Sequence, residues 1–295
     1  MGTPCSEREA SRRRDVRARW RPGRAEGTWQ RATRALISPA PTPGWRVPHE
    51  TKPQFSPVAR HYASARPTYP RALFAFLRSL VERGGLAWDC ATGNGQAAVQ
   101  LAEHFDRVIA TDVSAEQLRY AVAHPRIEYR REAAEESGLE PSSVDLVTVA
   151  AAVHWFDLPR FLEEVRRVLR PGGLLAVWTY HVARSGAPFT DVLWRLYRDH
   201  LFEDFAAGAR IVDDRYETLH LPNPVAPLPT FEAGAEWDLD QMLEFIASWS
   251  GSHAYHRRTS RHPLHLVRDD LARLWGAPER TRTLRWPIYL KVSRP

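Results

Sequence analysis

The stretch that decides the fold is Leu86-Ala-Trp-Asp-Cys-Ala-Thr-Gly-Asn-Gly-Gln96. A short apolar run ends in an acid, a turn with two glycines follows, and good helix formers continue to Ala102. Glycines in such a turn let a ligand approach the backbone, and the amides that open the next helix have no partners inside it. The pattern therefore predicts a strand, a glycine turn and a helix, with a nucleotide-like cofactor at the carboxyl end of the strand.

Apolar runs and helical spacings continue this alternation on both sides of the glycine turn. They predict strands at 108–112, 126–130, 144–150 and 174–178, helices at 71–83, 96–104 and 159–169, a helix capped by Ser114, and a turn at 171–173. Strands that alternate with helices at this spacing form a parallel sheet with right-handed crossovers. The fold class is therefore α/β, with helices on both faces of the sheet.

The pattern changes after Tyr180. It predicts a helix at 188–205, a Pro-rich loop at 221–229, a strand at 231–237, helices at 240–249 and 264–275, and a last strand at 282–292. Strands separated by helices in this order indicate a sheet edge that carries an inserted helical cap.

The positive charge is concentrated at the beginning of the chain. Residues 1–53 hold twelve basic and five acidic side chains, a net charge of +7, whereas all 295 residues together carry +6. We interpret 1–53 as a disordered basic leader and 54–295 as the folded domain, with its core at about 85–180 and the cap and sheet edge at about 181–295. Because that domain is close to neutral, we expect no nucleic-acid partner.

The two cysteines, Cys5 and Cys90, form neither a disulfide framework nor a metal-ligand spacing. A reducing, cytoplasmic location and the absence of a metal are therefore expected. No apolar run approaches the roughly 18 residues of a membrane span, and no secretory signal follows the first charges.

Two cofactor classes are compatible with the glycine turn. Residues 93–98 fit the G-x-G-x-x-A pattern of dinucleotide sites, and Asp112 lies 17 residues beyond Gly95. Asp89 at the end of the first strand favours a different ligand, because a carboxylate there would repel a pyrophosphate and attract a cation.

Several segments together resemble the class I S-adenosylmethionine-dependent methyltransferases. The resemblance is carried by Asp89-x-Ala-Thr-Gly-Asn-Gly-Gln96, Asp112-Val-Ser-x-x-Gln-Leu118, Ala134-Glu135, Val144-Asp-Leu-Val147, His154-Trp-Phe-Asp157 and Val168-Leu-Arg-Pro-Gly-Gly173. The Tyr-Ala-x-x-Arg-Pro-x-Tyr-Pro segment at 62–70, His154-Trp-Phe-Asp157 and Trp249-Ser-x-x-His253 resemble the methyltransferase type 11, trans-aconitate methyltransferase-like branch. The resemblance implies a Rossmann-like, mostly parallel sheet with an antiparallel last strand, and S-adenosyl-L-methionine as cofactor.

The resemblance also assigns roles to residues of the cofactor site. Asp112 would accept hydrogen bonds from both ribose hydroxyls. Relatives often carry Asp at the position of Ala133, so Glu132 or a backbone carbonyl is left to contact the adenine amino group. The methionine part would meet Asp89, Gly93, Gly95 and Gln96; the adenine would meet Val113, Ala134 and Glu135; and Tyr62 and Arg66 would close over the cofactor.

The candidate catalytic residues follow the fourth strand. His154 is a candidate base or substrate ligand, or a ring packed beside the cofactor; Trp155 either walls the methyl-transfer pocket or packs under the cap. Asp157 is expected to cap the next helix. A base is required if the acceptor is a hydroxyl or a carbon acid, and is not required if it is a carboxylate.

The acceptor is expected to bind at the cap. Trp249, His253 and Arg257 belong to a basic, aromatic cluster that suits an anion or that forms a solvated surface, and Arg66 could hold a carboxylate as a fork. We expect a methyltransferase acting on a small molecule, on an oxygen of an organic acid or a similar metabolite, as a monomer or homodimer. The alternatives are a methyltransferase that acts on a macromolecule, a non-catalytic cofactor-binding protein and an NAD-dependent oxidoreductase.

Overall fold

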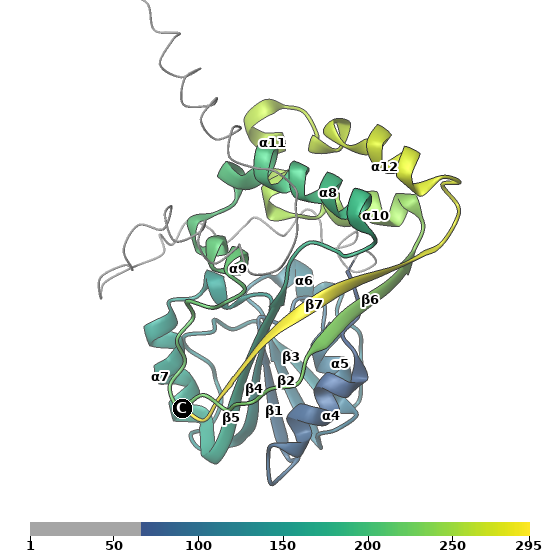
Figure 1. Cartoon of the computed structure of the whole chain (residues 1–295). Helices are drawn as coiled ribbons and strands as arrows, with labels where there is room; N and C mark the ends of the chain where they lie inside the picture. Colours follow the sequence, from purple (N-terminus) through teal and green to yellow (C-terminus); the bar gives the residue numbers. More distant parts are fainter. Residues whose placement is uncertain (1–65) are drawn as a thin grey trace, which may run out of the picture. The chain divides into compact units, whose positions relative to one another are not determined.

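A seven-stranded sheet organises the part of the chain that the computed structural model describes, residues 66–295 (Figure 1). The basic leader expected at 1–53 lies outside this range. The strand order is β3-β2-β1-β4-β5-β7-β6. The strands are β1 (Leu86–Cys90), β2 (Arg107–Thr111), β3 (Ile127–Arg130), β4 (Val144–Ala150), β5 (Leu169–Tyr180), β6 (Phe231–Trp237) and β7 (Arg282–Ser293).

The sheet is parallel from β3 to β5, and β7 runs antiparallel to both of its neighbours. This confirms the predicted Rossmann-like α/β sheet with an antiparallel last strand. The chain order reverses between β1 and β4, which are adjacent although β2 and β3 lie between them in sequence. Ligands of open α/β sheets bind at the carboxyl ends of strands at such a switch point.

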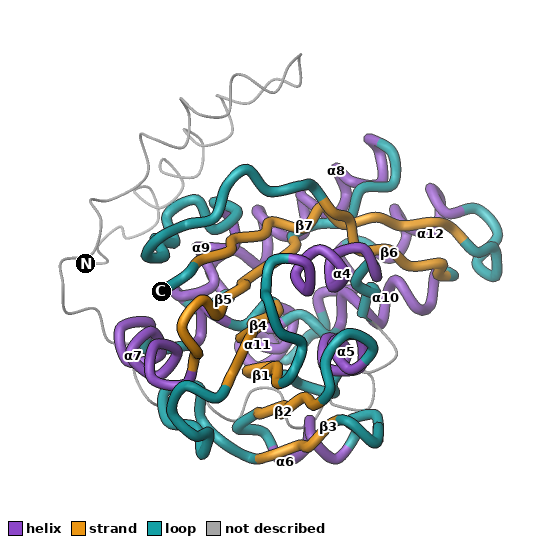
Figure 2. Tube along the Cα trace, turned by 90° about the horizontal axis from the view of Figure 1, so that it is seen from below, coloured by secondary structure: helices purple, strands orange, loops and turns teal. Residues whose placement is uncertain are grey.

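Helices cover both faces of the sheet (Figure 2). Neighbouring residues of a strand face opposite sides, so Ala87 and Leu146 pack on one face while Trp88 and Val147 pack on the other. The helices α4 (Arg71–Ser79) and α5 (Gln96–Ala102) contribute to the first face, and α7 (Leu158–Val168) contributes to the second. Burial on both sides explains why these strands read as continuous apolar runs.

Two of the predicted helix caps are present. Ser114 Oγ accepts from the backbone N–H of Gln117 at 3.2 Å and opens α6 (Ala115–Arg119). Asp157 accepts from the N–H of Arg160 at 3.4 Å and opens α7. Both caps satisfy amides that the first turn of a helix leaves without partners.

The sequence predicted a turn at 171–173 before a strand at 174–178, but this start of the strand is wrong, because β5 begins at Leu169. Val144 pairs with Leu169, but Leu146 already pairs with Leu174. The residues between Leu169 and Leu174 therefore form a bulge inside β5. The apolar pattern marked only the second, regular part of this strand.

Asp145 joins three strands at this end of the sheet. Its carboxylate accepts from the N–H groups of Gly85 at 3.0 Å and Leu86 at 2.9 Å, and from Arg170 Nη1 at 3.1 Å. One side chain on β4 thus fixes the start of β1 and the first residues of β5.

The cap consists of two insertions rather than one. The first lies between β5 and β6 and the second between β6 and β7, and α12 of the second packs on α8 of the first (Figure 1). The first insertion holds α8 (Ala187–Arg195), a π-helical segment (Leu196–Leu201), 3-10 turns (Phe202–Asp204 and Ala207–Ala209) and α9 (Arg210–Asp213); the second holds α10 (Leu239–Ala247), α11 (Ser250–Thr259), a 3-10 turn (Pro263–Leu266) and α12 (Arg268–Trp275).

The helix α11 was not predicted from the sequence. Glycine and serine near its start are weak helix formers, and its pattern is only faintly amphipathic. Packing compensates for this weakness: a Cβ at Gly251 would lie 2.5 Å from the ring of Phe205, and Ser252 Oγ donates to the Ile246 carbonyl at 2.7 Å. The helix forms because its smallest residue allows a close approach.

A buried polar cluster attaches the first insertion to the end of β5. The backbone N–H of Val182 donates to His181 Nδ1 at 2.9 Å, so the other ring nitrogen, Nε2, carries the proton and donates to Asp213 at 2.9 Å. The hydroxyl of Tyr197 also donates to this carboxylate. The ring of Trp194 stacks on His181, with centroids 4.7 Å apart. Both nitrogens of His181 are therefore used for structure.

Candidate functional site

The two glycines of the turn have different surroundings. Gly95 has φ +88°, and a Cβ there would lie 2.3 Å from the Tyr129 hydroxyl of β3. Gly93 has φ +59°, and a Cβ there would meet only Gln117 Oε1, at 3.8 Å. Gln117 is buried and this oxygen has no hydrogen-bond partner among the described residues. The space beside Gly93 is therefore open and has an unsatisfied polar atom at its edge, whereas Gly95 is required by its protein neighbour.

Asp89 is the buried carboxylate at the end of β1. It is 1% exposed and accepts hydrogen bonds from Thr92 Oγ1 at 2.5 Å and Thr148 Oγ1 at 2.7 Å. Burial raises its pKa to about 6 in spite of these bonds. Within residues 66–295 no basic side chain forms an ion pair with it. A cation placed beside Asp89 would stabilise its ionised form.

Asp112 stands just beyond β2 and binds the same turn. One of its oxygens accepts from the N–H of Gly93 at 2.9 Å and the other from the N–H of Ser114 at 2.8 Å. Each carboxylate oxygen offers two acceptor directions, so one on each oxygen remains for a ligand. The adjacent Val113 is 41% exposed, although large apolar side chains of the described residues are mostly covered. A ligand with two neighbouring hydroxyls could donate to the free acceptor directions of Asp112. A flat apolar ring on the same ligand could cover the exposed side chain of Val113.

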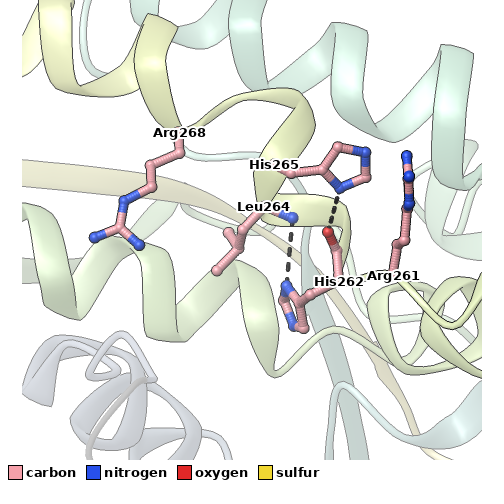
Figure 3. A pocket seen from close by; sticks show the side chains of 5 residues that line it. All are labelled: Arg261, His262, Leu264, His265 and Arg268. Atoms are coloured by element: carbon pink, nitrogen blue, oxygen red, sulfur yellow. Dashed lines mark hydrogen bonds between the residues drawn. The ribbon is translucent and has the colours of Figure 1, made fainter.

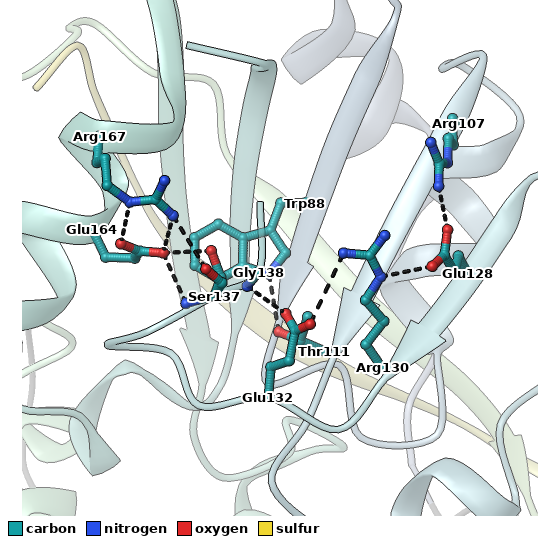
Figure 4. Close-up of polar contacts among 10 residues, drawn as sticks. All are labelled: Trp88, Arg107, Thr111, Glu128, Arg130, Glu132, Ser137, Gly138, Glu164 and Arg167. Atoms are coloured by element: carbon teal, nitrogen blue, oxygen red, sulfur yellow. Dashed lines mark hydrogen bonds and ion pairs between the residues drawn. The ribbon is translucent and has the colours of Figure 1, made fainter. Parts of the chain in front are cut away.

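The remaining candidates for the adenine side are partly committed to protein contacts. Ala134 is 7% exposed, and Glu135 Oε1 accepts from the N–H of Asp157 at 2.9 Å, which anchors the loop after β4. Glu132 accepts from the N–H of Gly138 at 3.1 Å and lies 3.9 Å from Arg130 (Figure 4). The carboxylate of Glu132, which was considered as a contact for the adenine amino group, is thus already bound by protein groups. Gln96 opens α5 and is partly exposed.

His154 lies in a 3-10 turn, Val153–Trp155, directly after β4. Its Nδ1 is 3.3 Å from the hydroxyl of Tyr216, and its ring centroid is 5.0 Å from that of Trp155. Burial lowers the pKa of His154 to about 4, so the imidazole is neutral near pH 7. A neutral imidazole has one donor and one acceptor nitrogen, and can accept a proton.

Tyr216 is a site residue that sequence reasoning missed. It lies in the connection between α9 and β6, is fully buried, and has a positive φ of 63°, which a tyrosine rarely adopts. Burial raises the pKa of Tyr216, and a hydrogen bond from Thr179 on β5 opposes part of that effect. No local pattern announces this role, because only folding brings it to His154.

Arg66 is found with the predicted acceptor residues. Its Nη1 donates to the Tyr180 hydroxyl at 3.3 Å, its Nη2 donates to the Ser248 carbonyl at 3.4 Å, and its guanidinium lies 5.5 Å from the ring centre of Phe245. Arg66 thus connects the end of β5 with the end of α10. The sequence analysis considered Arg66 both as a residue that closes over the cofactor and as a ligand of a carboxylate; Tyr62, the other residue expected to close over the cofactor, lies outside the described residues.

The predicted acceptor residues of the cap lie in different environments. Trp249 is 9% exposed and meets Phe245 edge to face at 5.7 Å, so it belongs mainly to the cap core. His253 is half-buried; its Nε2 is fully covered and has no hydrogen-bond partner among the described residues. Burial lowers the pKa of His253, and the positive charges of His262, Arg257 and Arg66 lower it further. Arg257 is exposed.

A shallow cavity of about 470 Å³ lies on the cap (Figure 3). Its lining consists of Arg261, His262, Leu264, His265 and Arg268. The side chains of His262 and His265 are held by backbone groups: His262 Nδ1 accepts from the N–H of Leu264 at 3.3 Å, and His265 Nδ1 donates to the His262 carbonyl at 2.5 Å.

Two searches restricted to residues 66–295 complete the description. No group of three His, Cys, Asp or Glu side chains could hold a metal ion there. No helix in that range combines the length and apolar character that crossing a bilayer requires.

Comparisons with known proteins agree with this geometry. Residues 88–177 match the family model described as a methyltransferase domain. A methyltransferase of Dictyostelium discoideum is 30% identical over 266 residues, which cover 88% of this chain and 99% of that protein. An S-adenosylmethionine-dependent methyltransferase of Saccharomyces cerevisiae is 32% identical over 228 residues, 64% of this chain and 78% of its own length.

A solved structure supports the same relationship. A type II methyltransferase from Anaeromyxobacter dehalogenans has a TM-score of 0.71 and 41% identity, covering 78% of this chain and 97% of its own. This similarity covers far more of the chain than residues 88–177 of the family model. With its sheet order, its glycine turn and these relatives, the chain belongs to the class I S-adenosylmethionine-dependent methyltransferases.

Proposed function

We propose that the protein transfers the methyl group of S-adenosylmethionine to a small molecule, at an oxygen of an organic acid or a similar metabolite. The observation that carries the acceptor class is the position of Arg66, whose guanidinium donates to Tyr180 at the end of β5 and to Ser248 after α10. A guanidinium suits a carboxylate, to which it can donate two parallel hydrogen bonds, and its positive charge also contributes to the lowered pKa of His253 in the cap. The trans-aconitate methyltransferase-like branch is the proposed affiliation within the family.

The residues at the glycine turn fit the cofactor. Asp89 offers a buried negative charge to the cationic methionine part, and Gly93 leaves space beside it. Asp112 retains an acceptor direction on each oxygen for the ribose, and the exposed face of Val113 suits the adenine. When bound, S-adenosylmethionine supplies an activated methyl group on a sulfonium sulfur. The protein contributes orientation and exclusion of water, which supply much of the rate in such transfers.

We infer that the enzyme works in the cytoplasm, as a monomer or homodimer, without a nucleic-acid or membrane partner. The near-neutral charge of residues 54–295 supports the absence of a nucleic-acid partner. Cys90, one of only two cysteines, is buried, and burial raises the pKa of its thiol, so it is a packing residue rather than a nucleophile.

The test is a screen of metabolites with labelled S-adenosylmethionine, in which transfer of the label and the mass of the product are measured. Transfer to organic acids, together with binding of S-adenosylhomocysteine by calorimetry, is the expected result. Transfer to nucleic acid or protein only would refute the small-molecule proposal. Binding of the cofactor product with no transfer to any acceptor would support the non-catalytic alternative.

A further inference from the structure

The segment from the end of α10 to the start of α12 contains no acidic residue. Between Glu244 and Asp269, residues 245–268 hold four arginines and four histidines, and neither Asp nor Glu. One arginine is compensated from another part of the cap, because Arg258 forms an ion pair with Asp204 of the first insertion at 2.6 Å. The other three arginines form no ion pair with any of residues 66–295. This part of the cap therefore carries cations without counter-charges among the described residues.

Two of these three arginines line the cavity of about 470 Å³ on the cap. Arg261 and Arg268 lie on opposite sides of the 3-10 turn Pro263–Leu266, and both are exposed (Figure 3). Each guanidinium carries five N–H donors. Since neither has an ion-pair partner within residues 66–295, both can turn these donors toward a ligand in the cavity.

The two histidines of the cavity are held in place by backbone groups of the same turn. The N–H of Leu264 donates to Nδ1 of His262 at 3.3 Å, so the proton of the neutral ring lies on Nε2. Nδ1 of His265 donates to the carbonyl of His262 at 2.5 Å, which leaves its Nε2 for other contacts. His262 therefore offers an N–H from Nε2, and His265 offers one when an anion favours its protonated form.

The size and the donors of the cavity indicate the chemistry of its ligand. A volume of about 470 Å³ lies in the range of small-molecule sites. Arginine binds carboxylate and phosphate oxygens in the same forked geometry. A carboxylate has two oxygens in one plane, whereas a phosphoryl group has three terminal oxygens and a charge of about −1.5 to −2. Because Arg261 and Arg268 approach from opposite sides, the phosphoryl group matches these surroundings better.

We propose that the cap cavity binds a small molecule through a phosphoryl group, which Arg261 and Arg268 hold from two sides and His262 and His265 contact from the turn. The phosphoryl group is bound intact, and no bond is made or broken. This inference goes beyond the proposed function, because the cavity lining does not include Arg66 and its occupation requires neither the cofactor nor methyl transfer.

The site is tested by calorimetry of the full chain with inorganic pyrophosphate as the probe. Arg261→Gln and Arg268→Gln should each weaken binding about tenfold or more, because each removes charged donors from the cavity. The matched control is Arg280→Gln, which removes the same charge from an exposed arginine outside the cavity and should leave the affinity unchanged. The basic residues of 1–53 are identical in all three variants. Equal weakening in the control would overturn the proposal, because it would show a response to overall charge.

NMR of the protein labelled with ¹⁵N-histidine locates the probe without relying on the arginine variants. The ring signals of His262 and His265, assigned with His262→Gln and His265→Gln, should shift when pyrophosphate is added. The signal of His220, an exposed histidine that does not line the cavity, is the internal reference and should stay in place. Binding measured by calorimetry without a shift of either cavity histidine would overturn the proposal.

Two further comparisons separate the ligand class and the acceptor site. Titrated on the signals of His262 and His265, citrate, which carries carboxylates only, should bind about tenfold more weakly than pyrophosphate; equal or tighter binding of citrate would refute the phosphoryl class. Arg66→Gln should leave pyrophosphate binding unchanged, and a loss as large as that of Arg261→Gln would assign the anion to the proposed acceptor site instead. A failure of methyl transfer to organic acids would refute the proposed function and leave these binding results as they are.

Discussion

Asp89 and Asp112 stand at the ends of the paired strands β1 and β2, and both hold the glycine turn. Thr92 donates to Asp89, and the N–H of Gly93 donates to Asp112. Each carboxylate thus has a structural contact and capacity for a ligand. Substitutions here are expected to affect cofactor affinity more than folding.

Asp112→Ala should weaken the binding of S-adenosylhomocysteine by about 100-fold or more. Two hydrogen bonds from the ribose to a charged acceptor would be lost, and such bonds contribute about 1.5–3 kcal/mol each. Calorimetry measures the affinity and thermal unfolding confirms the fold. Asp269→Ala, which removes an exposed carboxylate of the cap, is the control. An affinity within threefold of the unmodified protein would refute the ribose role.

Cofactor affinity should fall as the pH falls through about 6. Burial raises the pKa of Asp89 to about 6 in the protein without ligand, so the carboxylate becomes protonated below that pH. A bound cation favours the ionised form, so binding must release this proton, and affinity decreases up to about tenfold per pH unit below 6. Calorimetry from pH 5 to 8 measures the slope. Asp89→Asn should bind weakly at every pH; a wild-type slope in this variant would exclude Asp89 as the titrating group.

At the scale of elements, the turn before α5 is shaped by β3. Gly95→Ala should destabilise the protein and weaken cofactor binding, because the residue has φ +88° and its Cβ would lie 2.3 Å from the Tyr129 hydroxyl. Removing that hydroxyl relieves part of the overlap, since the next ring atoms are 3.1 Å away. The double variant with Tyr129→Phe should therefore recover part of the unfolding free energy. Strict additivity of the two single changes would show that Tyr129 is not the obstacle.

Asp145 tests how β1, β4 and β5 are held together. Asp145→Ala should lower the free energy of unfolding by about 3 kcal/mol, because two backbone N–H groups and Arg170 lose their acceptor. Asp145→Asn retains one side-chain oxygen and should cost less. Chemical denaturation measures both values. Equal losses in the two variants would contradict an effect based on acceptor oxygens.

At the scale of the whole molecule, the contact between cap and sheet is where we propose that the acceptor binds. Arg66→Gln should raise the KM for an acidic acceptor about tenfold and leave the affinity for S-adenosylhomocysteine unchanged. The reason is that Arg66 contacts Tyr180 and Ser248, and so lies between the end of β5 and the cap, where we propose that the acceptor binds. Steady-state kinetics and calorimetry separate the two effects. Arg280→Gln, at an exposed arginine, is the control. A loss of cofactor affinity with unchanged KM would instead place Arg66 at the cofactor, the other role that the resemblance implies.

The sequence by itself determined the sheet and the glycine turn, because both depend on local patterns. The apolar runs next to Asp89 and Asp112 indicate strands that are buried in the sheet. The glycines at the turn indicate where the chain bends. The cap was less predictable: α11 forms through the approach of Gly251 to Phe205, and the bulge in β5 arises from its pairing with β4.

Only the tertiary structure decided the surroundings of His154 and Arg66. The hydroxyl of Tyr216 reaches His154 from 62 positions along the chain, and Arg66 meets Ser248 across 182. No spacing or periodicity encodes such meetings, because they result from the way the two insertions pack on the sheet. The sequence therefore specified the cofactor fold, and the tertiary packing specified which side chains surround His154 and Arg66.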